Sequence, residues 1–330
     1  MRRVLYLVQE YPQISETYIK TEIDRVKRNY TISILTMGAA NLPYCDHEPF
    51  EVLQRVDAPT LSAAVHKYRP DIIHGHYYHL APALAFLAKQ AGTYFTVRTH
   101  SFDVLDFGSL FKANVIAAVK DAVCRGVLCF AFVADRLINV GVPAAKVVPC
   151  WPVVDVAKFR DHGPNGPDVM NVGAALPKKE MKLFVDLAKE LPTAKFNLYM
   201  MGYQTAEIVN YAQATGSPVA VVPPVQPSDM PAEYKKHRWL VYTASKQLGT
   251  VGWPLSIAEA QASGVGALVQ NIRPDLAEYV GPGGYVFDTI EDARRIISQP
   301  FPEEKREAGF LHAEKSDIDK HIALLYQLWS

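Results

Sequence analysis

The sequence is poor in cysteine and has no excess of charge of either sign. Four cysteines in 330 residues, Cys45, Cys124, Cys129 and Cys150, are too few and too irregularly spaced for a disulfide framework, and they suit a reducing compartment. Cys124 and Cys129 lie in apolar sequence, so we expect buried small side chains there rather than metal ligands. The 34 basic residues balance the 34 acidic ones. This balance argues against a protein that mainly grips nucleic acid.

Long apolar runs and two common nucleotide-binding motifs are also missing. No stretch approaches 18 uninterrupted apolar residues, so the sequence predicts no membrane-spanning helix. The N-terminus has two arginines, but the apolar run after them is short and no small-residue cleavage site follows. It predicts a buried first strand rather than a signal peptide. Because no G-x-G-x-x-G follows that strand and no P-loop is present, a nicotinamide dehydrogenase and P-loop phosphoryl transfer are poorly supported.

Short runs of valine, isoleucine and leucine alternate with helical patterns, which is typical of βαβ units in parallel sheets. In the first half we expect strands in the ranges 2–9, 30–37, 71–77, 94–100, 126–132 and 146–151. The helical patterns between them begin at Ser15, about Leu61, about Ala81 and near Lys112. In the second half we expect strands in the ranges 169–176, 196–202, 218–224, 239–245, 266–270 and 284–288. Helices are expected there at about 179–190 and at 256–262.

Residues 152–167 interrupt this pattern with three prolines and two glycines, and we expect them to link two domains. The last helical pattern, 317–330, has no strand after it and is well placed to fold back across the first domain. We therefore predict a first domain of residues 1–155 together with the helix 317–330. The second domain comprises residues 156–316.

Ligands of doubly wound domains bind outside the carboxyl ends of the strands, so the loops there are the candidate sites. After the first strand, Ser15 is expected to cap a helix with Glu16 and Thr17 in its first turn. Free backbone N–H groups at such a start favour an anionic ligand, although Glu16 already supplies negative charge. A capped helix without a ligand is the alternative interpretation.

Histidines follow two further strands of the first half. His74 and His76 share one face of a strand, and His79 falls in the turn after it. Zinc is one interpretation, but no acidic or cysteine ligand follows at close spacing, so we expect polar site-lining groups or packing. His100 follows another strand directly, with Asp103 three residues on. A histidine there can donate to a sugar hydroxyl or a phosphate, or titrate near neutral pH.

In the second half the candidate residues point to a phosphate ligand. Lys178 and Lys179 lie at a strand-to-helix turn, where a lysine offers a point charge to a diphosphate. A glycine-containing polar loop leads into a helix that starts near Leu255 or Ser256, and such a start presents N–H groups to phosphate. Glu259 is an acid about one turn further into this otherwise apolar helix.

Six segments, taken in order, resemble the motifs of the retaining glycosyltransferases of family 4. EYPQISETYI resembles P-x-x-S-E-T-F-I, DIIHGHY a strand ending in I-H-x-H, and THSFD the motif H-x-x-D. VVDVAKF resembles V-D-x-x-x-F, and NVGAALPKKE the turn V-G-R-L-x-x-x-K-G. WPLSIAEAQASG resembles the helix P-L-x-x-x-E-A-x-A-x-G. The resemblance implies an α/β fold of the GT-B type, with two doubly wound Rossmann-like domains facing a central cleft.

The resemblance also implies a function. It predicts a retaining, metal-independent enzyme that moves a sugar from a UDP- or GDP-linked donor to an acceptor hydroxyl and needs no further cofactor. The acceptor would be a glycan, a lipid-linked molecule or a small molecule in glycan or glycoconjugate biosynthesis. We expect a cytoplasmic protein, with or without peripheral contact to the inner membrane face, and no nucleic-acid partner; no oligomeric state is predicted.

Site roles carry over from the family position by position. Glu259 would hold the ribose hydroxyls, and the backbone of Leu255 and Ser256 would meet the diphosphate. Gly252 and Trp253, just before that helix, would complete the donor site. Lys179 would stabilise the departing phosphate.

In the first domain the resemblance makes His100 the group that contacts the transferred sugar near its reacting carbon. The acceptor would lie near Ser15, Glu16 and Thr17, together with His76 and Asp103. No residue is implied as a metal ligand.

Three positions depart from the family pattern. Val251 stands where the family has its first acid, Ala174 where it has an arginine, and Glu180 where the turn has a glycine. Three cations could replace the missing charge: Lys178, Lys246 and Arg273. The departures leave open a non-catalytic relative that binds nucleotide sugars but has lost turnover. Another GT-B enzyme, an inverting transferase or an epimerase, fits the helix after Pro254 less well.

Overall fold

The computed structural model describes residues 1–13, 15–39, 47–105 and 107–330. The chain divides into two compact units. Unit 1 consists of Met1–Val153 and Ile318–Ser330, and unit 2 of Val154–Asp317. Cys45 lies outside the described residues, whereas the other three cysteines are buried free thiols. In the described ranges no helix combines the length and the apolar character needed to cross a bilayer.

The described residues of unit 1 form a seven-stranded sheet in the order β3-β2-β1-β4-β5-β6-β7, with every pair parallel. The strands are β1 (Arg3–Glu10), β2 (Thr31–Gly38), β3 (Glu51–Val52), β4 (Ile72–His76), β5 (Phe95–Arg98), β6 (Cys124–Phe130) and β7 (Val147–Cys150). The helices are α1 (Thr17–Val26), α2 (Ala58–Tyr68), α3 (Ala81–Ala91), α4 (Ser101–Leu105), α5 (Phe107–Leu110), α6 (Ala113–Lys120), α7 (Ala134–Asn139) and α16 (Ile318–Trp329).

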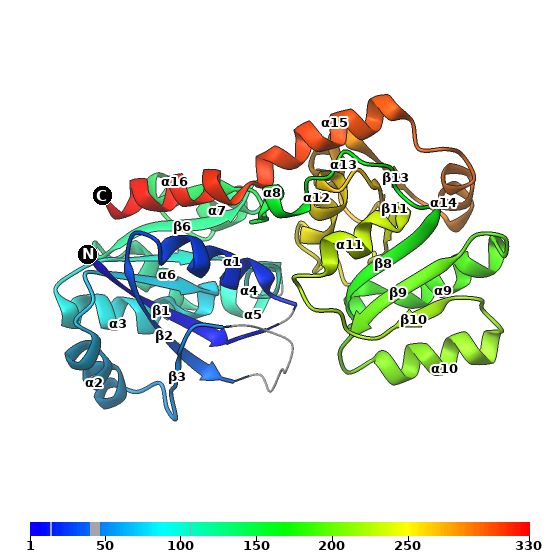
Figure 1. Cartoon of the computed structure of the whole chain (residues 1–330). Helices are drawn as coiled ribbons and strands as arrows, with labels where there is room; N and C mark the ends of the chain where they lie inside the picture. Colours follow the sequence, from blue (N-terminus) through cyan, green and yellow to red (C-terminus); the bar gives the residue numbers. More distant parts are fainter. Residues whose placement is uncertain (14, 40–46, 106) are drawn as a thin grey trace. The chain divides into compact units, whose positions relative to one another are not determined.

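Alternation along the strands decides which side chains of unit 1 meet which helix. Val4, Tyr6 and Val8 of β1 pack against apolar residues of α1 and α16 in one cluster. On β4, a Cβ at Gly75 would collide with Leu84 of α3, so this position faces α3. His74 and His76 therefore point to the opposite face, toward α1 and α16. Figure 1 shows α16, in red, lying along unit 1 at the end of the chain.

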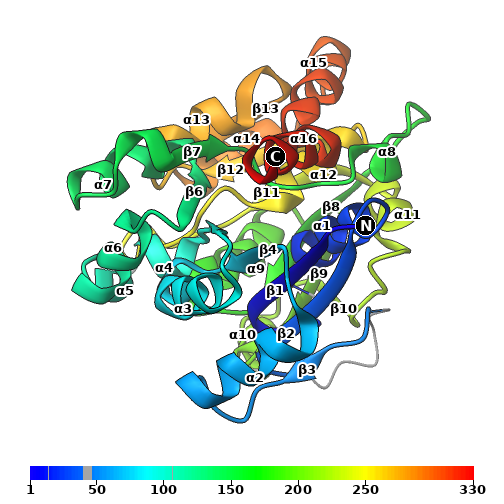
Figure 2. The same ribbon diagram turned by 90° about the vertical axis from the view of Figure 1, so that its left-hand side faces the viewer.

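Unit 2 forms a six-stranded parallel sheet in the order β10-β9-β8-β11-β12-β13. The strands are β8 (Asp168–Ala174), β9 (Phe196–Met201), β10 (Ala220–Val222), β11 (His237–Tyr242), β12 (Gly266–Gln270) and β13 (Gly284–Phe287). The helices are α8 (Val156–Phe159), α9 (Met181–Glu190), α10 (Thr205–Thr215), α11 (Met230–Lys235), α12 (Leu255–Ala262), α13 (Asp275–Val280), α14 (Ile290–Ile297) and α15 (Glu303–Ala313). The ribbon of each unit can also be followed in the turned view of Figure 2.

Helices α9, α10 and α14 of unit 2 turn their apolar faces toward one buried cluster. Phe184, on α9, meets Phe196 of β9 edge to face, with ring centroids 5.3 Å apart. Residues of α10 and α14 join the same buried cluster. Elsewhere in unit 2, α12 packs against α8 and α15. The two-sheet α/β architecture predicted from the sequence is thus confirmed.

Each strand range predicted from the sequence overlaps an observed strand, but several helix starts differ. The prediction that Ser15 caps the first helix is wrong, because α1 begins at Thr17 with Glu16 in the cap position. The second helix begins at Ala58 rather than near Leu61, since the side chain of Asp57 accepts a hydrogen bond from the backbone N–H of Thr60 at 3.0 Å.

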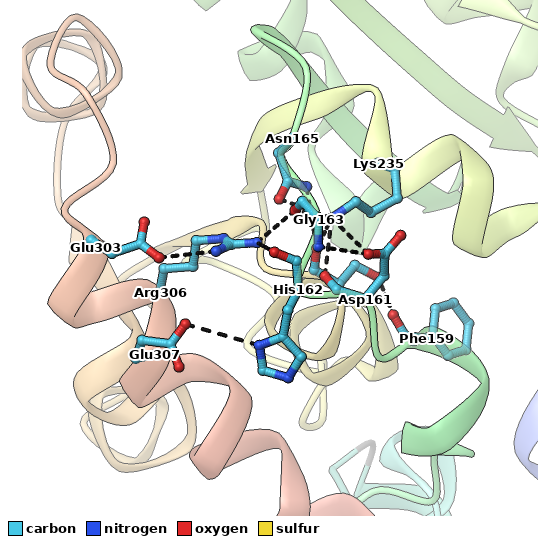
Figure 3. A network of polar contacts seen from close by, with 10 residues as sticks. Phe159, Asp161, His162, Gly163, Asn165, Lys235, Glu303, Arg306 and Glu307 are labelled. Carbon is cyan, nitrogen blue, oxygen red and sulfur yellow. Dashed lines mark hydrogen bonds and ion pairs between the residues drawn. The ribbon is translucent and has the colours of Figure 1, made fainter.

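The expected linker, residues 152–167, is mostly part of unit 2 rather than a free connection. Lys235 Nζ donates to the backbone carbonyls of Asp161 and Gly163 at 3.0 and 2.6 Å. Arg306 donates to the carbonyls of His162 and Gly163 at 2.9 and 2.7 Å. Figure 3 shows both cations converging on this segment. Proline has no N–H to donate to a carbonyl within a turn. In this segment Lys235 and Arg306 donate to the backbone carbonyls instead.

Replacing Lys235 tests this attachment. Lys235→Met keeps the length of the side chain but leaves several carbonyl acceptors without their donor, so we expect the free energy of unfolding of the full chain to fall by about 2 kcal/mol. Lys236→Met is the matched control, because its amine forms an exposed ion pair with Glu233, and it should change stability by less than about 0.5 kcal/mol. Urea denaturation measures both; equal losses would contradict the proposed attachment.

Candidate functional site

In unit 2 the candidate residues gather where the strand order reverses, between the neighbouring strands β8 and β11. The turn after β8 is tied to the segment after β11. The Thr243 hydroxyl donates to the Lys179 carbonyl at 2.8 Å, and the Ser245 N–H donates to the Lys178 carbonyl at 3.0 Å. The turn that carries Lys179 and the loop that follows β11 therefore form one braced edge.

Lys179 lies in a 3-10 turn, Pro177–Lys179, rather than in the predicted helix. Its amine hydrogen-bonds to the Tyr242 hydroxyl at the end of β11. Burial, together with the charge of Lys178, lowers the pKa of the Lys179 amine to about 7. Desolvation disfavours the ammonium until an anion arrives. An arriving phosphate would supply the charge that this site lacks.

Glu180 occupies the family's glycine position and keeps the backbone that glycine would adopt. Its φ and ψ are 45° and 43°, in the left-handed region. A side chain in this region costs roughly 1–2 kcal/mol. The family's turn therefore survives in this chain, at an energetic cost that a glycine would avoid.

The loop before α12 is held by Arg273. Its guanidinium donates to the carbonyls of Gly249 and Val251 at 3.1 and 2.5 Å and pairs with Asp275 at 2.8 Å. The Trp253 indole N–H also donates to Asp275, at 2.8 Å. These contacts commit Arg273 to fixing the loop, although it was a candidate to replace the charge missing at Ala174.

Four of the predicted donor-site residues lie at or just before the start of α12. The Trp253 ring stacks on Tyr279 with centroids 5.0 Å apart and planes 5° apart, and Gly252 is buried beside it. The Tyr279 hydroxyl donates to the carbonyl of Pro254, the cap residue, at 2.5 Å. Leu255 and Ser256 follow as the first residues of α12, where backbone N–H groups have no acceptor within the helix.

Glu259 is half-buried one turn into α12, and its carboxylate accepts a hydrogen bond from Tyr234 at 2.7 Å. Burial raises the pKa of Glu259. Val251, in the position of the family's first acid, is only 3% exposed. A carboxylate at this position would therefore be buried.

Lys246 is also engaged, because its amine lies 3.5 Å from a carboxylate oxygen of Asp288. Ala174 ends β8, and the adjacent Gly173 has φ of 154°. A Cβ at Gly173 would lie 3.9 Å from Lys179 Nζ. The amine of Lys179 thus lies beside the end of β8, whereas Lys246 and Arg273 are engaged elsewhere.

In unit 1, His100 lies directly after β5 and is 7% exposed. Its Nε2 is 3.1 Å from His76 Nδ1. Its ring lies against Tyr18 and Tyr77, with centroids 4.8 and 4.6 Å away. Burial, with the nearby His76 and Arg98, holds the pKa of His100 well below its usual range, so the imidazole is neutral.

Asp103 is fully buried and positions backbone rather than presenting a carboxylate to solvent. It accepts from the His100 N–H at 2.7 Å and from the Tyr78 N–H. Burial raises the pKa of Asp103 to about 7, although these hydrogen bonds oppose the rise. Asp103 therefore ties together the turns that follow β4 and β5.

Of the residues predicted beside the acceptor, Ser15 is exposed, and Glu16 and Thr17 are half-buried. The carboxylate of Glu16 accepts from the Tyr77 hydroxyl. Tyr77 itself has φ of 82°, a strained conformation for a bulky residue of the kind that clusters at functional sites. The structure thus brings Glu16, Tyr77 and His100 together, and His79 hydrogen-bonds to Gln9 at 2.9 Å.

Glu22 was not predicted and is completely buried. His74 and His76 place their Nε2 atoms 3.2 and 3.4 Å from its Oε1, and His321 of α16 lies 2.5 Å from its Oε2. Among the described residues, Glu22, His74 and His76 are the group whose ligand atoms lie close enough together to hold a metal ion. Glu22 and His74 lie far apart in the sequence, so no local pattern indicates this cluster. Only the fold brings α1 and β4 into contact.

Sequence comparison decides the family. Residues 37–151 match the model of the glycosyl transferase 4-like domain, and residues 157–299 match that of the glycosyl transferases group 1. This chain belongs to the group 1 glycosyltransferases. A search of curated proteins finds no match to the sequence.

Solved structures share the fold of this glycosyltransferase. HepE of Anabaena, crystallised with UDP and glucose, is 16% identical with a TM-score of 0.77, over 99% of this chain and 100% of that one. Sucrose-phosphate synthase of Thermosynechococcus elongatus is 16% identical with a TM-score of 0.74, over 99% and 98%. A glycosyltransferase of Rickettsia africae is 13% identical with a TM-score of 0.68, over 99% and 98%. The predicted GT-B type of fold is confirmed.

The left-handed Glu180 generates a stability prediction for this glycosyltransferase. Glu180→Gly removes the steric cost of the side chain, so we expect the free energy of unfolding to rise by about 1 kcal/mol. Lys189→Gly, at an exposed helical position of α9, should instead lower it by up to about 1 kcal/mol. Urea denaturation of both variants is the measurement. A loss of stability in Glu180→Gly would rule out the strain.

Proposed function

We propose that this glycosyltransferase transfers a sugar from a nucleoside diphosphate donor to an acceptor hydroxyl with retention of configuration and without a metal ion in the step. One observation carries the donor side: the desolvated amine of Lys179 lies at the end of β8, braced against the loop that leads into α12. A cation and a helix start at one sheet edge suit a diphosphate.

In this proposal the α12 amides of Leu255 and Ser256 bind the diphosphate, and Glu259 holds the ribose hydroxyls. Lys179 stabilises the charge that develops on the departing phosphate, which is electrostatic catalysis of a leaving group. Because Arg273 is committed to the loop carbonyls and Asp275, it does not replace the arginine missing at Ala174. Lys179 then carries more of the leaving-group stabilisation than it would beside an arginine.

His100 is proposed to contact the transferred sugar. The leaving phosphate would help to deprotonate the acceptor on the same face of the sugar, so no nucleophilic carboxylate is needed. We propose a glycan, lipid-linked or small-molecule acceptor near Glu16 and Thr17, and glycan or glycoconjugate biosynthesis in the cytoplasm as its setting. HepE in complex with UDP-glucose supports a UDP-linked sugar as the first donor to test.

The proposal is tested in two stages on the full chain. A panel of UDP- and GDP-linked sugars is first screened for a rise in melting temperature, because a ligand that binds only the folded state stabilises it by mass action. The donor that binds is then incubated with candidate acceptors, and products are followed by NMR, which also reports the anomeric configuration. Binding without transfer or hydrolysis would identify a relative that has lost turnover; an inverted product would contradict retention.

The pKa of Lys179 generates a pH prediction. The ammonium that binds phosphate is present below pH about 7 and is lost as the pH rises through that value. Donor affinity should therefore be constant below about 7 and fall by up to tenfold per pH unit above it. Calorimetry with a nucleotide sugar measures this, since its diphosphate does not titrate in this range. Lys179→Met should abolish the pH dependence, whereas Lys246→Met should retain it.

Glu259 and His100 should separate binding from turnover. Glu259→Gln keeps an acceptor for Tyr234 but weakens the ribose contact, so the donor Kd should rise about tenfold. His100→Ala should leave the donor Kd within about threefold and lower kcat about 100-fold. Tyr234→Phe is the control for Glu259, with a change in Kd below about threefold. Unchanged Kd in Glu259→Gln together with unchanged kcat in His100→Ala would refute the site.

A further inference from the structure

We infer that Glu22 is a positioning residue: acting through His76, it holds the His100 imidazole in the tautomer that carries its proton on Nε2 and presents Nδ1 as a hydrogen-bond acceptor. The inference rests on the proposed function for its catalytic meaning, but the tautomer itself is a property of the free protein. Arg98 is the one group of this network whose role as a donor is certain.

Arg98 settles the tautomer of His321. A guanidinium only donates, and Arg98 NH1 lies 3.0 Å from His321 Nδ1. His321 Nδ1 is therefore the acceptor, and the ring proton is on Nε2. That Nε2 lies 2.5 Å from Glu22 Oε2 and donates to it. Burial lowers the pKa of His321 to about 4, so the ring is neutral.

Glu22 is ionised and therefore only accepts. Burial alone would raise its pKa, but the histidine N–H groups that face it, including the His321 Nε2 donor, hold the pKa well below its usual range. The Tyr6 hydroxyl donates to Oε1 at 3.1 Å. His76 Nε2 lies 3.4 Å from the same oxygen and has no hydrogen-bond partner among the described residues, so this contact is electrostatic rather than a hydrogen bond. Because a lone pair facing a buried carboxylate would be repelled, the proton of His76 belongs on Nε2, and Nδ1 is left unprotonated.

His100 is the next link. Its Nε2 lies 3.1 Å from His76 Nδ1, and the planes of the two rings are 14° apart with their centroids 5.3 Å apart. Since His76 Nδ1 is the acceptor, His100 Nε2 donates. The backbone N–H of His100 donates to Asp103 at 2.7 Å, and this hydrogen bond fixes the backbone from which the ring projects. The neutral His100 ring then offers only a lone pair, on Nδ1.

This assignment narrows the role proposed for His100. An imidazole that offers only a lone pair accepts a hydrogen bond from a sugar hydroxyl and does not donate one to a phosphate oxygen. A proton on Nδ1 would reverse this preference. The buried carboxylate of α1 thus decides which partner the histidine recognises, as the buried aspartate of a serine protease decides the tautomer of its histidine.

A metal ion is the competing explanation for the convergence of Glu22, His74 and His76, but the charges oppose it. Arg98 already balances the carboxylate through His321. A divalent ion would leave two uncompensated positive charges in a buried site, and burial with the Glu22 charge raises the pKa of Tyr6 well above its usual range, so the phenol stays neutral. A zinc-bound His76 would also need an unprotonated Nε2, the opposite tautomer.

Nitrogen-15 NMR of histidine-labelled full-length protein tests the tautomer without substrate. Long-range proton–nitrogen spectra should show His100, assigned by its loss in His100→Ala, with a protonated Nε2 and a bare Nδ1. In Glu22→Gln the amide can donate to His76 Nε2, so both rings should switch their protons to Nδ1. Tyr6→Phe is the matched control: it removes another hydrogen bond to Glu22 and should leave the His100 tautomer unchanged.

Kinetics links the tautomer to catalysis. Glu22→Gln should lower kcat about 100-fold with donor Kd within about threefold, and Tyr6→Phe should keep kcat within about threefold. A proton on Nδ1 of His100 in the unmodified protein, or an unchanged tautomer in folded Glu22→Gln, overturns the inference. One zinc ion retained per chain after dialysis from zinc chloride, and lost in His74→Gln, also overturns it. If no sugar is transferred at all, the proposed function fails while the NMR result still decides the tautomer.

Discussion

A buried carboxylate holds the functional half of unit 1 together. Glu22 of α1 meets histidines of β4 and α16, and Arg98 of β5 completes the charge balance through His321. A buried charge is tolerated only when it is paired and hydrogen-bonded, and removing one partner typically costs 3–5 kcal/mol. The arrangement therefore constrains where these elements lie. His100 is one hydrogen bond away from this network, and we infer that Glu22 decides its protonation through that bond.

Unit 2 solves the opposite problem, since it must leave charge unsatisfied for a ligand. Arg273 saturates loop carbonyls and Asp275, which keeps the loop before α12 in one conformation. The Lys179 amine hydrogen-bonds to the Tyr242 hydroxyl, and burial together with the like charge of Lys178 lowers its pKa. Arg273 thus fixes the loop, whereas Lys179 is the cation that we propose binds the diphosphate. This division explains why an arginine in the sequence does not compensate for the one missing at Ala174.

The departures from the family pattern have different structural meanings. Glu180 keeps a left-handed backbone without the glycine that normally permits it, so the turn is preserved at a cost in stability. Val251 is buried, so an acid at this position would have to be buried as well. In the proposed function Val251 therefore bears on how the sugar is recognised, whereas Glu180 bears on stability.

The sequence by itself determined the strands, the order of the family motifs, and the positions of His100, Lys179 and Glu259 at strand ends and a helix start. These features follow from local periodicity and from spacing within one element, and both can be read directly from the order of the residues. Only the tertiary structure decided that Glu22 lies beneath His76, that Arg273 turns back to the loop, and that Asp103 binds backbone instead of facing a ligand. Those contacts join residues far apart along the chain, and their strength comes from burial that no local pattern encodes. The tautomer that we infer for His100 also depends on the tertiary structure. The position of its proton is set by polar partners that only folding brings together.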